Sequence, residues 1–286
     1  MVGAIPCYNE ERFIGSVVLK TRGLVDEIIV IDDGSTDETA KVAEQAGARV
    51  IRHDYNRGKA AAVTTAFQRA KEMGCQVLVL LDGDGQHDPS DIPKLVQPVL
   101  DGRSDIVVGS RFLGVDSDVP GYRVWGQRVL TLLTNLGSSV SVTDSQSGFR
   151  AFSRRAVETL SFAEKGLSVE SEMQFLAKES DLRVEEVSTH IGYLDSPKRN
   201  PVAHGMSVFN SIIGLISRRL PLIFFGVPGV IMMGFGLWQA WTVVQGYNST
   251  GEFYIGPALM AMVLCIIGSL SIFTGLILYT IRSFFK

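Results

Sequence analysis

The chain contains 286 residues, of which 46% are hydrophobic and 20% are charged, and its formal net charge is −3. This composition is too apolar for a disordered chain, and its acidic balance argues against a protein dedicated to nucleic acid, which needs a basic surface. The length admits one large domain or two small ones.

Short β-branched runs alternate with amphipathic helical segments over the first 110 residues. Strands are expected at residues 2–5, 27–31, 48–52, 76–81 and 105–108. Helices are expected at residues 10–20, 36–46, 59–73 and 91–100, the second capped by Ser35 or Thr36. This alternation predicts an α/β fold, with a mixed, mostly parallel, Rossmann-like sheet covered by helices on both faces.

The alternation weakens beyond about residue 114. Helices are expected at residues 122–136 and 169–178, and strands at residues 148–153 and 183–193. We expect this half to extend the sheet and to form the second wall of a site.

Two runs without charge, residues 220–251 and 253–281, lie near the C-terminus. They contain 32 and 29 residues, and each exceeds the roughly 20 residues that cross a hydrocarbon core about 30 Å thick. We therefore expect two transmembrane helices within residues 220–286, at about 220–243 and 256–281. Apolar residues at helical spacing indicate an interfacial helix over 201–219, with a core-packed helix as the alternative. A soluble domain is expected over residues 1–200.

The charges that flank the two spans predict their orientation. Arg218 and Arg219 precede the first span, Arg282 and Lys286 follow the second, and the connecting loop holds no Lys or Arg. Both termini are therefore expected inside, with the soluble domain in the cytoplasm. The first residues hold no apolar run long enough for an export signal, and three cysteines form no disulfide framework, which is typical of a reducing compartment.

A turn of two aspartates, Asp82-Gly83-Asp84-Gly85-Gln86, follows the most apolar strand of the soluble part. Carboxylates two residues apart can reach one divalent cation, Gln86 adds a neutral oxygen ligand, and the glycine backbone at Gly83 leaves room for a phosphate. Such hard oxygen ligands favour Mg²⁺ or Mn²⁺ over zinc. Acidic turns without any function also follow strands. The position of this turn, at the carboxyl end of a strand where open α/β sheets bind ligands, favours the metal interpretation.

Two further polar segments end neighbouring strands. Asp32-Asp33-Gly34-Ser35 forms a turn in which one aspartate is expected to accept hydrogen bonds from a base or ribose. Lys59 opens a helix after Asn56-Arg57-Gly58, where its ammonium and the free backbone N–H groups are suited to a phosphate. The turn after the first strand, residues 5–10, lacks the glycines of a dinucleotide fingerprint, so bound NAD is not expected.

The chain resembles family 2 glycosyltransferases of the GT-A fold in five stretches: Ile-Pro-Cys-Tyr-Asn-Glu at 5–10, Val-Ile-Asp-Asp-Gly-Ser-Thr-Asp at 30–37, Asn-Arg-Gly-Lys at 56–59, Asp-Gly-Asp-Gly-Gln at 82–86 and Val-Gly-Ser-Arg at 108–111. More closely, Ser-Gly-Phe-Arg-Ala-Phe at 147–152, Glu172-Met173 and the two spans resemble the dolichyl-phosphate mannose synthase group. The same features resemble the polyprenyl-phosphate glucosyl- and N-acetylglucosaminyltransferases. The Gln-x-x-Arg-Trp signature of processive polysaccharide synthases is absent from the sequence.

This resemblance implies transfer of a monosaccharide, with inversion, from GDP-mannose, UDP-glucose or UDP-GlcNAc to dolichyl or polyprenyl phosphate at the cytoplasmic membrane face. The residues that it assigns to the nucleotide sugar are Pro6, Tyr8, Glu10, Asp33, Asp82 and Asp84. It assigns Asp84 and Gln86 to the metal, and Arg111, Arg128 and Arg150 to the acceptor phosphate. Mannose synthases usually carry an Arg-x-x-Gly-x-Ser-Lys-like stretch after residue 193; here Lys198 and Arg199 stand there with a different spacing and are assigned to the diphosphate or the acceptor.

The acceptor chemistry agrees with these assignments, because a phosphate monoester has a second pKa of about 6 and needs no strong protein base. A lipid hydroxyl acceptor is the alternative and would need one, with Glu170 or Glu172 as the candidate. A catalytically silent nucleotide-sugar-binding membrane scaffold is a second alternative. The four histidines are expected to be structural. A homo-oligomer is compatible with the sequence, although the glycines of the first span form no clear small-xxx-small pattern.

Overall fold

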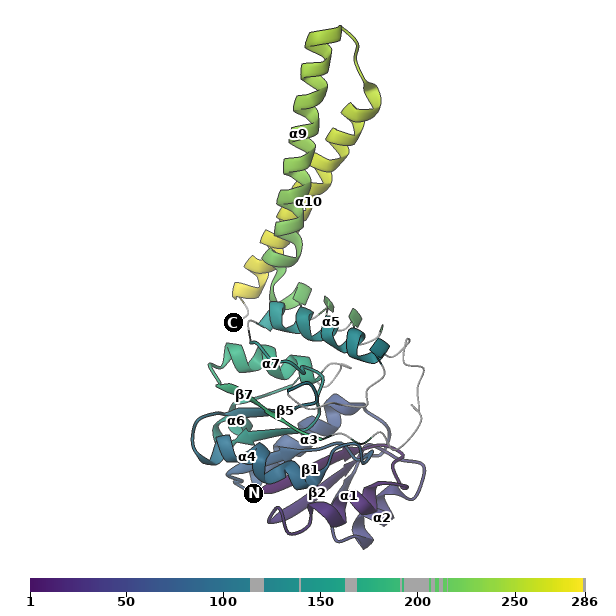
Figure 1. Cartoon of the computed structure of the whole chain (residues 1–286), viewed down its shortest axis with the longest axis vertical. Helices are drawn as coiled ribbons and strands as arrows, with labels where there is room; N and C mark the ends of the chain where they lie inside the picture. The colour runs from purple at the N-terminus through teal and green to yellow at the C-terminus, as the bar shows by residue number, and fades with distance from the viewer. Residues whose placement is uncertain are drawn as a thin grey trace. The chain divides into compact units, whose positions relative to one another are not determined.

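The structure is a computed structural model of the chain. It describes residues 1–113, 121–138, 140–162, 169–190, 192, 206, 209–210, 213–214 and 216–284, without the side chains of 121–125 and 137. The chain divides into two compact units, Met1–Ile212 and Ile213–Lys286 (Figure 1). Of the interfacial helix predicted over residues 201–219, about half lies outside the described residues.

A seven-stranded sheet forms the centre of the first unit. Its strands are β1 (Val2–Cys7), β2 (Glu27–Asp32), β3 (Arg49–Arg52), β4 (Val77–Leu80), β5 (Ile106–Ser110), β6 (Arg150–Ser153) and β7 (Val184–Ser188). Their order is β3-β2-β1-β4-β6-β5-β7, and every neighbouring pair is parallel except the two pairs that β6 makes with β4 and β5. The predicted mixed, mostly parallel sheet is confirmed.

Helices cover both faces of this sheet (Figure 1). They are α1 (Ile14–Thr21), α2 (Thr39–Gln45), α3 (Lys59–Glu72), α4 (Ile92–Leu100), α5 (Gly121–Ser138), α6 (Arg154–Thr159) and α7 (Val169–Glu179), with a short 3₁₀ turn η1 (Pro89–Asp91) before α4. One core packs under α3, α6 and α7, and the other packs under α1, α2 and α4. Successive residues of β2 alternate between the two cores: Ile29 and Ile31 enter the first, and Ile28 and Val30 enter the second.

The first two helices begin later than the sequence predicts. Asn9 adopts a left-handed φ of 55° and its N–H donates to Ser35 Oγ, while the N–H of Glu10 donates to Thr39 Oγ1. These bonds hold the end of β1 against the turn after β2, so α1 starts only at Ile14. The predicted cap at Ser35 or Thr36 is wrong, because α2 starts at Thr39 with Glu38 at its N-cap position and no side-chain cap there.

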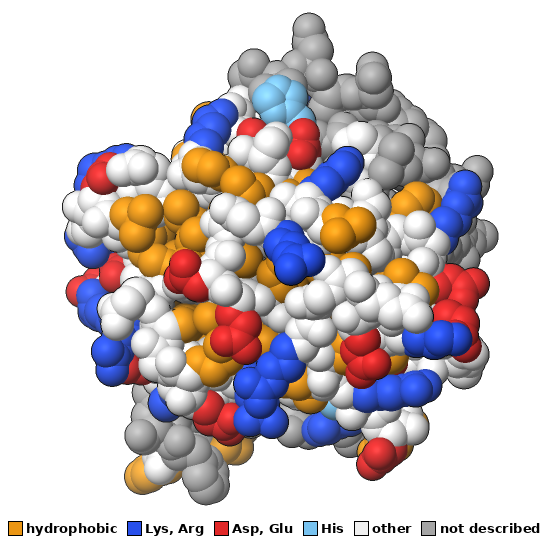
Figure 2. All heavy atoms as spheres, turned by 90° about the horizontal axis from the view of Figure 1, so that it is seen from below, with side chains coloured by type: hydrophobic (Ala, Val, Ile, Leu, Met, Phe, Trp, Pro, Cys, Tyr) orange, Lys and Arg blue, Asp and Glu red, His pale blue; other side chains and the backbone are white. Residues whose placement is uncertain are grey.

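The surface of the first unit mixes charges of both signs. On the face shown in Figure 2, Lys and Arg side chains alternate with Asp and Glu, and hydrophobic side chains lie between them.

Two long helices make up most of the second unit. They are α9 (Val227–Thr250), preceded by a π-helical turn η2 (Leu222–Gly226), and α10 (Ile255–Phe284). Both are long and apolar enough to cross a bilayer, and only 11% and 17% of their most apolar windows are buried within the chain. A core helix of a soluble protein would bury far more of its surface. These helices therefore point to membrane anchoring.

Small residues spaced by seven line the contact between α9 and α10. The buried positions include Gly229 and Gly236 on α9, and Ala261, Gly268 and Gly275 on α10. A Cβ atom added at Gly229 would lie 2.7 Å from the backbone oxygen of Gly268, so the two backbones meet directly. A repeat of seven residues keeps one seam of a helix facing its partner, and small residues let the helices approach.

Candidate functional site

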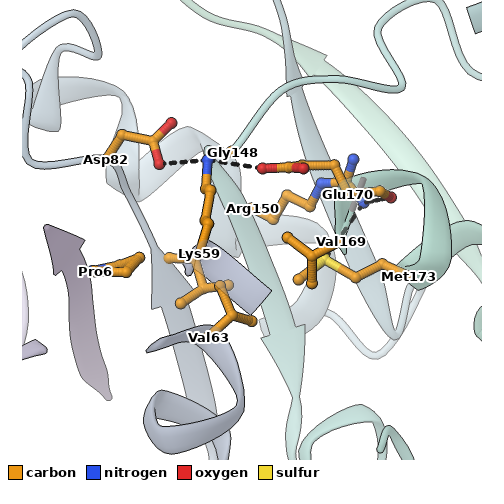
Figure 3. Close-up of a pocket in the computed structure, with 10 residues that line it drawn as sticks. Pro6, Lys59, Val63, Asp82, Gly148, Arg150, Val169, Glu170 and Met173 are labelled. Atoms are coloured by element: carbon orange, nitrogen blue, oxygen red, sulfur yellow. Dashed lines mark hydrogen bonds and ion pairs between the residues drawn. The ribbon is translucent and has the colours of Figure 1, made fainter. Parts of the chain in front are cut away.

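A pocket opens at the carboxyl ends of β1 and β4, beside the first turns of α3 and α7 (Figure 3). It is lined by Pro6, Lys59, Val63, Leu80, Asp82, Gly148, Arg150, Val169, Glu170 and Met173. This is the edge at which open α/β sheets place their ligands. The space left inside is only about 10 Å³, so the side chains that line the pocket largely fill it.

Lys59 joins two carboxylates across this pocket (Figure 3). Its Nζ atom lies 2.8 Å from Asp82 Oδ1 and 2.7 Å from Glu170 Oε1. Burial disfavours the charged amine, but the two carboxylates outweigh burial and raise the pKa of Lys59 above its ordinary value. The lysine predicted to hold a phosphate thus begins α3 as a fixed positive charge between β4 and α7.

The surroundings shift the pKa values of the two aspartates of the acidic turn in opposite directions. Burial disfavours ionised Asp82, but Lys59 and His87 outweigh burial and lower the pKa of Asp82 below its ordinary value. Burial and the charge of Asp82 raise the pKa of Asp84. A Cβ atom at Gly148 would overlap the Asp82 carboxylate, and one at Gly83 would lie 2.9 Å from Cys7 Cβ. Glycine at position 148 lets that backbone pack against Asp82, and glycine at position 83 lets the turn pack against Cys7.

The residues of this turn fit a divalent cation. The N–H of Gln86 donates to Asp84 Oδ1 at 3.0 Å, which curls the turn around the Asp84 carboxylate. A cation would relieve the repulsion that raises the pKa of Asp84. Within the described ranges, no group of three or more His, Cys, Asp or Glu side chains is placed to hold a metal. A cation here would therefore take further oxygens from phosphate or water, as Mg²⁺ does in many phosphate sites.

Asp33 ties the end of β2 to the loop that precedes α3. Its Oδ1 atom lies 2.7 Å from His53 Nδ1 and accepts from the N–H of Arg57 at 3.0 Å, and its Oδ2 atom accepts from the N–H of Gly58 at 2.7 Å. The side chain is almost fully buried. These bonds fix the start of α3 and with it the position of Lys59.

The remaining residues predicted for the nucleoside lie along the end of β1. Pro6 lines the pocket, and Tyr8 is 37% exposed just beyond the strand. Glu10 is half-buried and its N–H bonds to Thr39 beside the turn after β2. Lys198 and Arg199, also predicted for the substrate, lie outside the described residues.

The three arginines predicted for the acceptor occupy different surroundings. Arg111 pairs with the fully buried Asp144, through Nε to Oδ2 at 2.6 Å and through Nη2 to Oδ1 at 2.8 Å. Arg128 is exposed on α5. Arg150 is 1% exposed, and its guanidinium donates to the backbone oxygens of Ser145, Ser147 and Glu170. Burial lowers the pKa of Arg150.

Three site residues escaped assignment from the sequence or received another role there. The sequence predicts Glu170 only as a base for a hydroxyl acceptor, yet the Glu170 carboxylate forms an ion pair with Lys59. The sequence predicts a structural role for His87, yet its Nε2 atom lies 3.6 Å from Asp82 Oδ2, and its Nδ1 atom is buried without a hydrogen-bond partner among the described residues. Asp144 lies in the polar stretch before Arg150. Nothing in that stretch indicates that Asp144 pairs with Arg111, 33 positions earlier in the chain.

Residues 4–161 match the model of the family described as "Glycosyl transferase family 2". The chain is 35% identical over 205 residues to UDP-N-acetylglucosamine–dolichyl-phosphate N-acetylglucosaminyltransferase of Methanococcus voltae, covering 64% of this chain and 82% of that protein. It is 32% identical over 200 residues to dolichol-phosphate mannosyltransferase of Pyrococcus furiosus, covering 66% of this chain and 55% of that protein.

A similar solved structure is glucosyl-3-phosphoglycerate synthase from Mycobacterium tuberculosis in complex with Mg²⁺ and uridine-diphosphate. It has a TM-score of 0.61 and 28% sequence identity, and the match covers 76% of this chain and 78% of that chain. The same protein was also solved with Mn²⁺, uridine-diphosphate and phosphoglyceric acid.

Proposed function

Because the chain belongs to glycosyl transferase family 2 and is a glycosyltransferase related to the polyprenyl-phosphate sugar transferases, we propose that it transfers a monosaccharide from a nucleotide sugar to dolichyl or polyprenyl phosphate. Transfer proceeds with inversion at the cytoplasmic face of a membrane. The observation that carries this proposal is the joining, in one chain, of the acidic turn at Asp82 and Asp84 to two helices apolar enough to cross a bilayer. Those helices would anchor the chain in the membrane that also holds a lipid acceptor.

The donor side of the site is assigned to the turn after β4 and the loop before α3. Asp84 and Gln86 would hold Mg²⁺ or Mn²⁺, and the bound cation would supply positive charge to the departing diphosphate. Lys59 adds a second positive charge at the start of α3, where backbone N–H groups also favour an anion. Asp33 acts by fixing the loop that carries Lys59. Its carboxylate is already bound by His53 and by the backbone N–H groups of Arg57 and Gly58. Pro6, Tyr8 and Glu10 face the nucleoside.

The acceptor side needs positive charge rather than a base. A phosphate monoester is largely ionised near pH 7 and can attack the anomeric carbon directly, so the protein contributes position and charge. We assign this task to Arg111 and Arg128. Arg150 instead holds the loop at residues 145–148 in place, because its guanidinium is spent on three backbone oxygens.

A lipid hydroxyl acceptor is disfavoured by the surroundings of Glu170. A hydroxyl must lose its proton on attack and needs a carboxylate free to accept it. Glu170, one of the two candidate bases beside Glu172, is engaged by the Lys59 ammonium at 2.7 Å. This engagement favours a nucleophile that arrives already ionised.

The proposal is tested with the full chain in detergent, a panel of GDP- and UDP-sugars, and Mg²⁺ or Mn²⁺ added or withheld. Undecaprenyl phosphate, diacylglycerol and 3-phosphoglycerate serve as separate acceptors. The expected result is metal-dependent product on undecaprenyl phosphate from one donor. Product on diacylglycerol or 3-phosphoglycerate alone would show that polyprenyl phosphate is not the acceptor. Nucleotide-sugar binding without product on any acceptor would favour a silent binding protein.

A further inference from the structure

Arg111 is held by a chain of contacts that begins on β7 and ends at its buried pair with Asp144. The Arg111 side chain is 10% exposed and that of Asp144 is 0% exposed. The backbone N–H of Arg111 also donates to Asp144 Oδ2, at 3.2 Å. The pair is therefore side-on and uses Nε and Nη2 together, which fixes the plane of the guanidinium as well as its position.

The backbone around Asp144 is itself held by hydrogen bonds to the Glu186 carboxylate. Glu186 Oε1 accepts from the N–H of Asp144 at 3.1 Å, and Oε2 accepts from the N–H of Thr143 at 2.7 Å. Thr143 Oγ1 in turn lies 2.6 Å from the hydroxyl oxygen of Ser110, the last residue of β5. Since β7 pairs with β5, this arrangement locks the loop at 143–144 to both strands.

Stability alone is a weak explanation for this arrangement. A buried ion pair pays a desolvation penalty that often cancels its attraction, so replacing it by apolar side chains is often neutral for folding. The same loop continues to Gly148, which packs on the donor-side Asp82. The Asp144 pair thus lies on a segment that touches the donor side of the site and holds an acceptor-side arginine.

We propose that Asp144, with Glu186 behind it, is a positioning residue that aims the Arg111 guanidinium at the acceptor phosphate. This inference rests on the proposed function, since it assigns Arg111 to the acceptor. A guanidinium recognises phosphate through a planar fork, so its direction matters as much as its charge. A misplacement of about 1 Å in a positioned group costs on the order of a hundredfold in rate.

The test compares Asp144→Asn with a matched variant at the other end of β5. Asp105, just before β5, pairs with Arg183 through Nε at 3.0 Å, so Asp105→Asn removes an aspartate–arginine pair far from Arg111 along the same strand. We expect Asp144→Asn to raise the KM for undecaprenyl phosphate by roughly tenfold to a hundredfold. The affinity for UDP or GDP, measured by titration calorimetry, should stay within about twofold of wild type. Asp105→Asn should leave both quantities near wild type.

A double-variant cycle separates aiming from general damage. If Asp144 acts through Arg111, then adding Asp144→Asn to Arg111→Ala should cost no further activity, whereas independent effects would multiply. Farnesyl phosphate binding, measured by calorimetry, gives a second readout that does not depend on turnover. Glu186→Gln leaves both members of the pair in place and should raise the KM for undecaprenyl phosphate by about fivefold, the value of one hydrogen bond. It carries the test if Asp144→Asn does not fold.

Two outcomes would overturn the inference. The first would leave the proposed acceptor site in place, and the second would remove it. A raised KM in Arg111→Ala with wild-type KM in Asp144→Asn and Glu186→Gln would remove the positioning role alone. Unchanged acceptor KM and farnesyl phosphate binding in all three variants would remove Arg111 from the acceptor and the proposed acceptor site with it.

Discussion

Replacing Gly148 by alanine is expected to damage the site while the fold persists. A Cβ atom at this position would lie 2.9 Å from Asp82 Cγ, where ordinary van der Waals contact begins at 3.4 Å, and it would overlap the carboxylate oxygens. Asp82 must therefore move by about half an ångström or more in a close-packed interior. That movement disturbs the 2.8 Å ion pair with Lys59. Overpacking of this kind costs about 1–3 kcal/mol of folding free energy, and the displaced carboxylate should lower kcat/KM by roughly tenfold to a hundredfold.

The measurements are kcat/KM for sugar transfer and the melting temperature in detergent. Gly126→Ala serves as the control, because a Cβ atom added at Gly126 on α5 would meet no atom of the described residues within 4 Å. That variant should retain full activity and gain up to about 1 kcal/mol from improved helix propensity. Wild-type kcat/KM in Gly148→Ala would refute the reasoning that the packing of residue 148 sets the position of Asp82.

Three further predictions concern the acidic turn, the contact between α9 and α10, and the pair of Asp105 with Arg183. Asp84→Asn should abolish metal-dependent transfer and leave the melting temperature near wild type; a variant that still responds to Mg²⁺ would remove Asp84 from the metal. Gly268→Leu should destabilise the second unit by several kcal/mol, because its side chain meets the Gly229 backbone, and an unchanged melting temperature in detergent would count against the seam. Burial opposes ionised Asp105, but bonds from Arg183 outweigh burial and lower its pKa below the ordinary 3.8. A lowered pKa adds stability above pH 3.8 that is lost as the pH falls through the folded value, so the stability difference between wild type and Asp105→Asn should vanish in acid unfolding.

The strands were predictable because each is a short apolar run between polar turns. All seven expected strands appear in the sheet, and the acidic turn follows β4 as anticipated. What local pattern could not show is which strands pair. The antiparallel insertion of β6 between β4 and β5 joins Leu80 to Arg150 and Val108 to Arg150 across long stretches of chain.

The same limit applies to the side chains of the site. Lys59 could be placed at a helix start from its own neighbourhood, but its partner Glu170 lies 111 positions away. The delayed start of α1 likewise depends on bonds from Asn9 and Glu10 to residues after β2, which a helical pattern does not encode. In the second unit, the seven-residue spacing of Gly229 and Gly236 became meaningful only with Gly268 opposite Gly229 and Ala261 opposite Gly236.

The most direct test of polyprenyl-phosphate glycosyl transfer is mass spectrometry of the lipid product. The full chain is reconstituted in liposomes that contain undecaprenyl phosphate and is supplied with nucleotide sugar and Mn²⁺, beside its Asp84→Asn variant. The expected result is undecaprenyl phosphate heavier by one hexose or N-acetylhexosamine, formed by the wild type and not by the variant. Equal amounts of product from both proteins, or intact lipid in the presence of an active donor, would contradict the assignment.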